Sequence, residues 1–181
     1  YISSINSKEL KKIKNNCSTN YNILNTTDVI FVCLPTPLKN KKPDLSYLKN
    51  CYNKLSKINL INKLIILEST VYPGVTRNLI NKIIIKQKLK IGVNFYAGYS
   101  PERENPGDNN FSYKITPKVV SGYTDQCLDI VKLCYSNIVK KITKASSLEV
   151  AESSKLLENI YRAVNIGMIN EMKIISDRLS L

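Results

Sequence analysis

Four short apolar runs, separated by polar turns and helical segments, are the feature of this sequence that most constrains its fold. They cover residues 28–34, 63–67, 94–99 and 118–121. Consecutive apolar residues are typical of strands buried on both faces, as the strands of parallel sheets are. Apolar positions with helical spacing predict helices between or after these runs, at residues 45–55, 75–88 and 125–135. The alternation of strand and helix predicts an α/β fold with a doubly wound parallel sheet.

A longer helical pattern begins near Ser147 and continues to the end of the sequence. Its apolar positions form a stripe that is too broad to be left in water. The change from alternating elements to one unbroken helix is the best candidate for a domain boundary. We therefore expect an α/β unit over residues 1–145 and the start of a helical unit over residues 146–181.

The composition excludes several classes of protein. The sequence contains no histidine, so metal sites that need imidazole and Ser-His or Cys-His catalysis are excluded. Its five cysteines are scattered without a Cys-x-x-Cys pair, which fits reduced thiols rather than disulfides. No apolar run approaches the length of a membrane span, and the N-terminal residues lack the apolar core of a signal peptide. We expect a cytoplasmic protein, with neither a membrane nor a metal ion as partner.

The formal net charge of +13 raises the alternative of a basic, non-enzymatic nucleic-acid-binding domain. The lysines, however, are spread along the whole chain, and only four arginines occur. Proteins that read nucleic acids usually depend on arginine forks and stacked aromatic side chains. We therefore favour a solvated, lysine-rich surface and expect no nucleic-acid partner.

Polar and proline-rich tripeptides follow three successive apolar runs. They are Pro35-Thr36-Pro37, Glu68-Ser69-Thr70 and Pro101-Glu102-Arg103. The carboxyl ends of parallel strands meet at one edge of an open sheet, where such folds bind their ligands. Two prolines around Thr36 make a stiff lip suited to a flat ring, and Glu102 could act as a general base or orient a water. Each tripeptide alone would be ordinary turn chemistry, but three at one edge predict a binding site.

The long helix adds a polar stripe formed by Lys155, Asn159 and Arg162. Their spacing of four and three residues places them on one helix face. A lysine and an arginine on one stripe can hold a phosphate or stabilise a developing oxyanion. The alternative is a solvated helix face, which the neighbouring Glu152 and Glu158 support.

Several segments resemble the UDP-glucose/GDP-mannose dehydrogenases, in the same order and at similar spacing. They are DVIFVCLPTPL, KKPDLSYL, ILESTVYPGVTR, FYAGYSPERENPGD, KVVSG and VAESSKLLENIYRAVNIGMINEM. YPG after EST, and GYSPER followed by NPGD, look most like the bacterial UDP-N-acetylhexosamine 6-dehydrogenases of surface-polysaccharide synthesis. The resemblance covers nearly the whole chain after about Ile23.

The resemblance implies an NAD-dependent oxidation of a UDP-sugar C6 alcohol to a carboxylate, in two hydride transfers through a cysteine-bound thiohemiacetal and thioester. It implies cofactor contacts by Pro35, Thr36, Pro37, Ser69 and Thr70. It assigns Thr70 and Glu102 to holding or activating water, and Lys155 and Asn159 to the oxyanion formed at C6. The sugar nucleotide would be contacted by Glu102, Arg103, Glu104, Asn105, Lys155, Asn159 and Arg162. It also implies a homodimer formed largely through the long helix.

The sequence also departs from the family's pattern. The family opens with a glycine-rich phosphate turn, whereas no two of the six glycines here form Gly-x-Gly. The family's nucleophilic cysteine lies in a Gly-x-Cys-hydrophobic-Pro setting, which none of the five cysteines here has. We therefore expect residues 1–145 to form a partial, Rossmann-like NAD-binding domain lacking its first strand-turn-helix, and residues 146–181 to begin the central helical domain. Such a fragment should lack dehydrogenase activity and bind NAD weakly.

The identity of the sugar stays open. The resemblance favours UDP-N-acetylglucosamine or UDP-N-acetylgalactosamine. UDP-glucose, GDP-mannose and UDP-N-acetylmannosamine are the alternatives. In the family, the contacts that discriminate among these sugars lie largely outside the segments quoted above.

Overall fold

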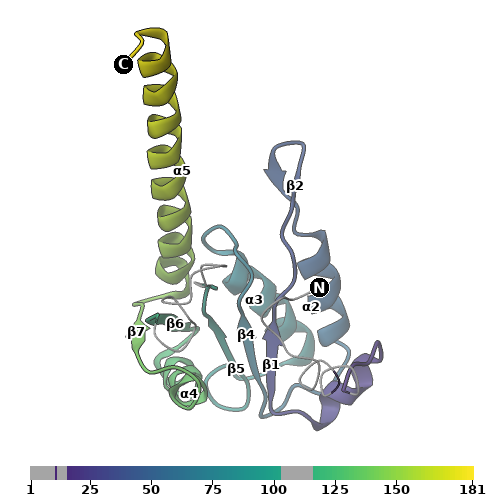
Figure 1. Ribbon diagram of the computed structural model, residues 1–181. Coiled ribbons are helices and arrows are strands. Elements are labelled where there is room, and N and C mark those ends of the chain that lie inside the picture. Colours follow the sequence, from purple (N-terminus) through teal and green to yellow (C-terminus); the bar gives the residue numbers. More distant parts are fainter. Residues whose placement is uncertain (1–10, 12–15, 103–115) are drawn as a thin grey trace.

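Five strands form the central sheet of the computed structural model, which describes residue 11 and residues 16–102 and 116–181 (Figure 1). The strands are β1 (Val29–Val32), β4 (Leu64–Leu67), β5 (Tyr96–Tyr99), β6 (Lys118–Gly122) and β7 (Ile142–Lys144), in the spatial order β1-β4-β5-β6-β7. β1, β4 and β5 are parallel neighbours. Their carboxyl ends therefore lie at one edge of the sheet, as the sequence predicts.

β6 runs in the opposite direction, which is a correction to the predicted strand directions within the expected doubly wound fold. It pairs antiparallel with β5, and β7, which was not predicted, pairs parallel with β6. Glycine at position 98 allows this close pairing, because a Cβ there would lie 2.5 Å from the Ser121 carbonyl oxygen and from Val131 Cγ2. The sheet is thus mostly parallel, with one reversed pair.

Helices cover both faces of the sheet. They are α2 (Ser46–Leu55), α3 (Val75–Gln87), α4 (Asp125–Ser136) and α5 (Leu148–Arg178). α2, α3 and the start of α5 pack on one face, and α4 packs on the other. Side chains alternate along β4, so that Ile65 and Leu67 belong to the first interface and Leu64 and Ile66 to the second. Because both faces of β4 are buried, its sequence is apolar at every position.

Besides β7, the structure adds a short helix and a hairpin that the sequence analysis does not predict. They are the 3-10 helix η1 (Tyr21–Thr26) and the hairpin of β2 (Leu38–Lys39) and β3 (Lys42–Pro43). The hairpin turn places Asn40 and Lys41 at φ 52° and 61°, the left-handed pair that a two-residue hairpin loop requires. The hairpin and α5 project from the same end of the sheet (Figure 1).

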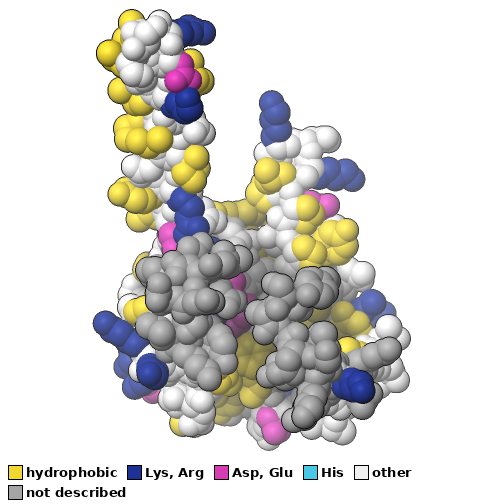
Figure 2. Space-filling model, in the orientation of Figure 1, with side chains coloured by type: hydrophobic (Ala, Val, Ile, Leu, Met, Phe, Trp, Pro, Cys, Tyr) yellow, Lys and Arg dark blue, Asp and Glu magenta, His cyan; other side chains and the backbone are white. Residues whose placement is uncertain are grey.

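α5 is buried only at its beginning. Its buried residues are Leu148, Ala151 and Glu152, and Ser147 caps the helix by accepting a hydrogen bond from the Val150 N–H at 3.2 Å. Most later apolar side chains of α5 are exposed, and Figure 2 shows them along the projecting part of the helix. None of the helices in the described part of the chain has an apolar stretch long enough to cross a membrane.

Candidate active site

Side-chain hydroxyls fasten the loop after β1 to the loop after β4. The Leu34 N–H donates to Ser69 Oγ at 2.9 Å, and Ser69 Oγ donates to the Leu34 carbonyl at 2.7 Å. The Thr36 hydroxyl donates to the Thr70 carbonyl at 2.8 Å. The structure thus brings the predicted cofactor residues together at one edge of the sheet, where two of their hydroxyls hold the loops in place. These residues are Pro35, Thr36, Pro37, Ser69 and Thr70.

Ser100 joins the end of β5 to the strands on both of its sides. Its N–H donates to the Leu67 carbonyl at 3.0 Å, and its hydroxyl donates to the Val119 carbonyl at 2.7 Å. Glu102 is exposed and follows Ser100 by only two residues. Glu102 therefore lies at the same edge of the sheet. The other predicted residues of this loop, Arg103, Glu104 and Asn105, lie outside the described residues.

Glu68, the first residue after β4, is the centre of a polar cluster that the sequence analysis does not predict. Its carboxylate accepts a hydrogen bond from the Tyr135 hydroxyl and lies 3.1 Å from Lys118 Nζ. The Cys33 thiol donates to its other oxygen at 3.7 Å. The cluster therefore ties β1, β4, β6 and α4 together next to the strand ends.

Cys33 is the cysteine nearest to the strand ends, and it is not an activated nucleophile. Partial burial of the thiol, followed by the Glu68 carboxylate, raises the pKa of Cys33 to about 11. The thiol is therefore protonated near neutral pH, and only thiolates are strong nucleophiles. All five cysteines of the chain are free.

Lys155 and Arg162 both lie beside Glu158 on α5. Lys155 Nζ is 3.7 Å from one Glu158 oxygen, and Arg162 Nη2 is 3.6 Å from the other. Only 14% of the Lys155 side chain is exposed, whereas Asn159 and Arg162 are exposed residues. The predicted stripe is present, and its more buried end is the one closer to the sheet, since the start of α5 packs against β5 and β6.

Glu152, which the sequence analysis took as support for a solvated helix face, is instead fully buried (0% exposed). Its carboxylate accepts hydrogen bonds from the Gly74 N–H at 2.6 Å, the Thr76 N–H at 2.9 Å and the Thr76 hydroxyl at 2.6 Å. A side chain of α5 therefore caps the N-terminus of α3. The sequence carried a signal for this contact, since Glu152 follows Leu148 and Ala151 inside the apolar stripe.

A second contact joins α3 and α5 nearer to the surface. Arg77 donates from Nε to one Glu149 oxygen at 2.6 Å and from Nη2 to the other at 3.1 Å. The same guanidinium lies 4.7 Å from the centroid of the Tyr123 ring. The hydrogen bonds from Arg77 lower the pKa of Glu149 to about 2. The two partners are 72 residues apart in sequence, so local spacing gave no sign of the pair.

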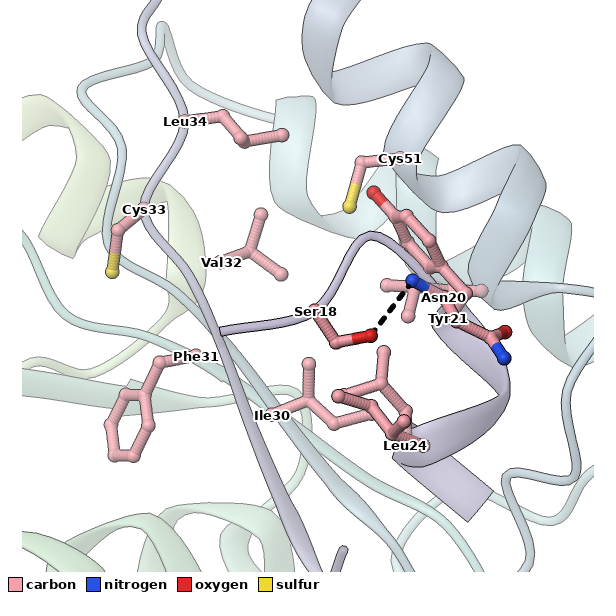
Figure 3. Close-up of a pocket in the computed structure, with 12 residues that line it drawn as sticks. Ser18, Asn20, Tyr21, Leu24, Ile30, Phe31, Val32, Cys33, Leu34 and Cys51 are labelled. Atoms are coloured by element: carbon pink, nitrogen blue, oxygen red, sulfur yellow. Dashed lines mark hydrogen bonds between the residues drawn. The ribbon is translucent and has the colours of Figure 1, made fainter. Parts of the chain in front are cut away.

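A cavity of about 260 Å³ lies beside β1, between η1 and α2 (Figure 3). Ile30 and Val32 point toward it from β1, and Leu34 points toward it from the loop that follows. Tyr21 and Cys51 approach each other at its far side. Of the described residues that line it, none is a predicted catalytic, cofactor or substrate residue. Within the described part of the chain, the cavity reaches the strand ends only through Cys33 and Leu34.

A mostly parallel sheet, with helices on both faces and polar residues at its joined strand ends, defines a nucleotide-binding domain of the Rossmann type. Comparison with known proteins makes the class specific. The UDP-glucose/GDP-mannose dehydrogenase family, NAD binding domain, matches residues 3–139. The chain belongs to this family, and NAD is the cofactor of the matched domain.

Individual relatives agree with this assignment. Protein CapL of Staphylococcus aureus is 39% identical over 180 residues, which are 98% of this chain and 42% of that protein. UDP-N-acetyl-D-glucosamine 6-dehydrogenase of Pseudomonas aeruginosa is 38% identical over 181 residues, 98% of this chain and 43% of that protein. The structure of UDP-D-ManNAc dehydrogenase from Pyrococcus horikoshii matches with a TM-score of 0.88 at 26% identity, covering 99% of this chain and 45% of that one. The chain thus spans less than half the length of these relatives.

Proposed function

We propose that the protein is an NAD-dependent nucleotide-sugar 6-dehydrogenase, which oxidises the C6 hydroxyl of a UDP-N-acetylhexosamine to a carboxylate for surface-polysaccharide synthesis. The observation that carries the proposal is the 38% identity to a relative named UDP-N-acetyl-D-glucosamine 6-dehydrogenase. The joined strand ends support it, because they hold in place the residues that the family resemblance assigns to the cofactor.

In this proposal the strand ends bind the nicotinamide end of NAD. Pro35 and Pro37 flank Thr36 and make a stiff surface against which a flat ring can lie. Ser69 and Thr70 hold that surface in position through their hydrogen bonds to Leu34 and Thr36. The residues present therefore fit this end of the cofactor, which accepts hydride when it is bound.

The proposed chemistry at C6 depends on Lys155 and Asn159, which stabilise the oxyanion. Lys155 suits this role because only 14% of its side chain is exposed, and a charge stabilises a developing oxyanion more strongly where water is excluded. Thr70 and Glu102 are proposed to hold or activate the water that hydrolyses the thioester after the second hydride transfer. Substrate contacts are proposed for Glu102, Arg103, Glu104, Asn105, Lys155, Asn159 and Arg162.

Formation of NADH by the natural protein that contains this sequence tests the proposal. UDP-N-acetylglucosamine or UDP-N-acetylgalactosamine should be oxidised, and UDP-glucose and GDP-mannose should react at least about tenfold more slowly. Lys155→Ala should lower kcat about 100-fold with little change in the Kd of NAD. Lys173→Ala, which removes an exposed lysine of the same helix, is the matched control and should leave kcat unchanged. No NADH from any nucleotide sugar would contradict the proposal.

UDP-N-acetylmannosamine is the second candidate substrate. It is favoured by the fold similarity to the Pyrococcus horikoshii enzyme, a UDP-D-ManNAc dehydrogenase. The same assay decides between the two candidates, because the preferred substrate is the nucleotide sugar with the highest kcat/KM. A kcat/KM highest for UDP-N-acetylmannosamine would replace the first candidate without changing the proposed chemistry.

The 181-residue polypeptide assayed by itself should form no NADH and should bind NAD weakly. Its sequence contains no Gly-x-Gly turn to hold the pyrophosphate and no cysteine in a Gly-x-Cys setting. Calorimetric titration with NAD measures the expected weak binding. Robust NADH formation by this polypeptide would contradict the expected lack of activity.

We further propose a homodimer formed through α5. The 31 residues of this helix span about 46 Å, and apolar side chains such as Ile160, Val164 and Met168 are exposed along it. A second copy of the same face can cover such a surface. Light scattering should give the mass of a dimer for the wild type and of a monomer for Ile160→Glu/Val164→Glu. The control Asn170→Glu, at an exposed polar position, should remain dimeric.

The domain division and the cellular location are also proposals. The change from the sheet to a projecting helix supports a partial NAD-binding domain over residues 1–145 and the start of a central helical domain over residues 146–181. Five free thiols support a reducing, cytoplasmic location. Nucleic acid is not a proposed partner, so any binding to duplex DNA should be weak and should disappear as salt is raised.

A further inference from the structure

Glu152 is a fully buried carboxylate whose three hydrogen-bond donors all belong to the start of another helix. Its two oxygens accept from the Gly74 N–H, the Thr76 N–H and the Thr76 hydroxyl, at 2.6 to 2.9 Å. A carboxylate is favoured at this position because the N-terminus of a helix carries partial positive charge and unpaired N–H groups. Since all three donors come from the N-cap residue and the first turn of α3, the side chain fixes the position of α3 relative to α5.

The two segments joined by Glu152 are the ones that carry the two halves of the proposed active site. In the chain, Thr76 follows the strand-end residue Thr70 by six positions. On α5, Lys155 and Asn159 follow Glu152 by three and seven positions, which places them on the same face of the helix. A shift of Glu152 would therefore move the lysine relative to the strand ends.

The surroundings of Glu152 leave it little freedom to move. Leu148 and Ala151 beside it are fully buried. Tyr99, from the end of β5, is also fully buried, and burial followed by the charge of Glu152 raises the pKa of Tyr99. Hydrogen bonds to a charged group are stronger where water is excluded. The Arg77–Glu149 pair joins the same helices but has side chains that are 35% and 34% exposed, so water competes with it.

We propose that Glu152 is a positioning residue for the dehydrogenase reaction, acting through Lys155. By holding the N-terminus of α3 it sets the distance between the Ser69–Thr70 strand end, where the cofactor binds, and the ammonium that stabilises the oxyanion. The inference rests on the proposed function. Nothing in the family resemblance assigns a role to this residue.

Glu152→Gln in the natural protein is the first test. Glutamine keeps the size of the side chain but replaces one acceptor oxygen with an NH₂ group, which cannot accept from an N–H. Displacement of Lys155 should lower kcat about 100-fold while the Kd of NAD changes less than about twofold. The matched control is Glu149→Gln, which changes the partly exposed Arg77–Glu149 pair between the same two helices. It should lower kcat less than about threefold. A lower melting temperature with unchanged kcat in the folded protein would overturn the proposal.

A double substitution tests whether Glu152 acts through Lys155. If it does, Glu152→Gln combined with Lys155→Ala should lose no more than about twofold beyond Lys155→Ala alone, because the positioned group is already absent. Losses that multiply would show two independent effects and would overturn the proposal.

Amide hydrogen exchange separates this inference from the proposed function, because it needs no activity. Exchange over residues 70–76 and 155–159 should rise at least about tenfold in Glu152→Gln and less than about threefold in Glu149→Gln. If the wild type oxidises no nucleotide sugar, the proposed function fails; unchanged exchange would instead end the positioning role. Should Glu152→Gln not fold, Thr76→Val removes one donor and should change exchange in the same direction, and no change there would also overturn the inference.

Discussion

The first turn of α5 is buried, whereas most of the rest of the same helix is exposed. Leu148, Ala151 and Glu152 are buried against the sheet and against α3, whereas Leu157 is 68% exposed only two turns later. Both regions have apolar residues at helical spacing, so their sequences look alike. The difference shows that an apolar stripe predicts a buried face without telling which neighbour covers it. At the start of α5 the neighbour is this chain's own sheet, and beyond it we propose a second copy of the chain.

Replacing the same residue type in the two regions should give the largest contrast. Leu148→Ala should lower the free energy of unfolding by about 3 kcal/mol, because the residue is fully buried and its removal leaves a cavity. Leu157→Ala should change it by less than about 0.5 kcal/mol in the monomer. Urea denaturation of both variants measures this. Equal losses would mean that the two regions do not differ in burial.

Thr76→Val should have the next largest effect. It keeps the shape of a fully buried side chain but removes the hydroxyl that donates to Glu152 at 2.6 Å. A hydrogen bond to a buried charged group contributes about 2 kcal/mol, and this is the expected loss in the free energy of unfolding. Thr76→Ser keeps the hydroxyl and is the control. A larger loss for serine than for valine would show that the methyl group matters more than the donor.

Glu149→Gln should have a smaller and pH-dependent effect. The pKa of Glu149 is lowered from 4.5 to about 2 in the folded protein, mainly by hydrogen bonds from Arg77. The stabilisation is therefore fully present above pH 4.5 and is lost as the pH falls toward about 2. Because the pair is partly exposed, the loss at neutral pH should be about 1 kcal/mol. Stability curves of wild type and variant that stay parallel down to the lowest pH would refute the assignment.

Asp177→Asn, near the far end of α5, should have the smallest effect. Asp177 accepts from Lys173 Nζ at 2.7 Å, but both side chains are mostly exposed and lie one helical turn apart. Such pairs contribute about 0.3 kcal/mol, and salt weakens them further. Thermal unfolding in low and high salt should barely separate the variant from the wild type. A loss above about 1 kcal/mol would mean that this end of the helix is packed after all.

Much of the fold follows from the sequence, because buried strands and amphipathic helices leave strong local patterns. β1, β4, β5 and the four helices lie where their apolar residues predict them. The direction of β6 does not follow, since a strand buried on both faces is apolar in either orientation. β7 and the β2–β3 hairpin were missed because their strands are only two or three residues long and mostly exposed.

The candidate site was predictable where strand ends meet and unpredictable where distant helices touch. Parallel pairing of β1, β4 and β5 is enough to bring Thr36, Ser69 and Glu102 to one edge, so their grouping followed from topology. The contacts of Glu68 with Lys118 and Tyr135, and of Glu152 with Thr76, depend on packing between segments far apart in sequence. Glu152 was therefore taken as support for a solvated helix face, although buried carboxylates persist where donors surround them.

α5 leaves the sheet as one unbroken rod of about 46 Å, held at its buried first turn. A small change of angle at its base therefore produces a large displacement at its far end. A tilt of about 5° at the base would carry the far end sideways through about 4 Å, roughly three quarters of the 5.4 Å rise of one helical turn. The Glu152 carboxylate fixes the angle between α5 and the sheet. That angle therefore determines the position of the residues near position 175, and with it the register in which the α5 helices of two copies can pair.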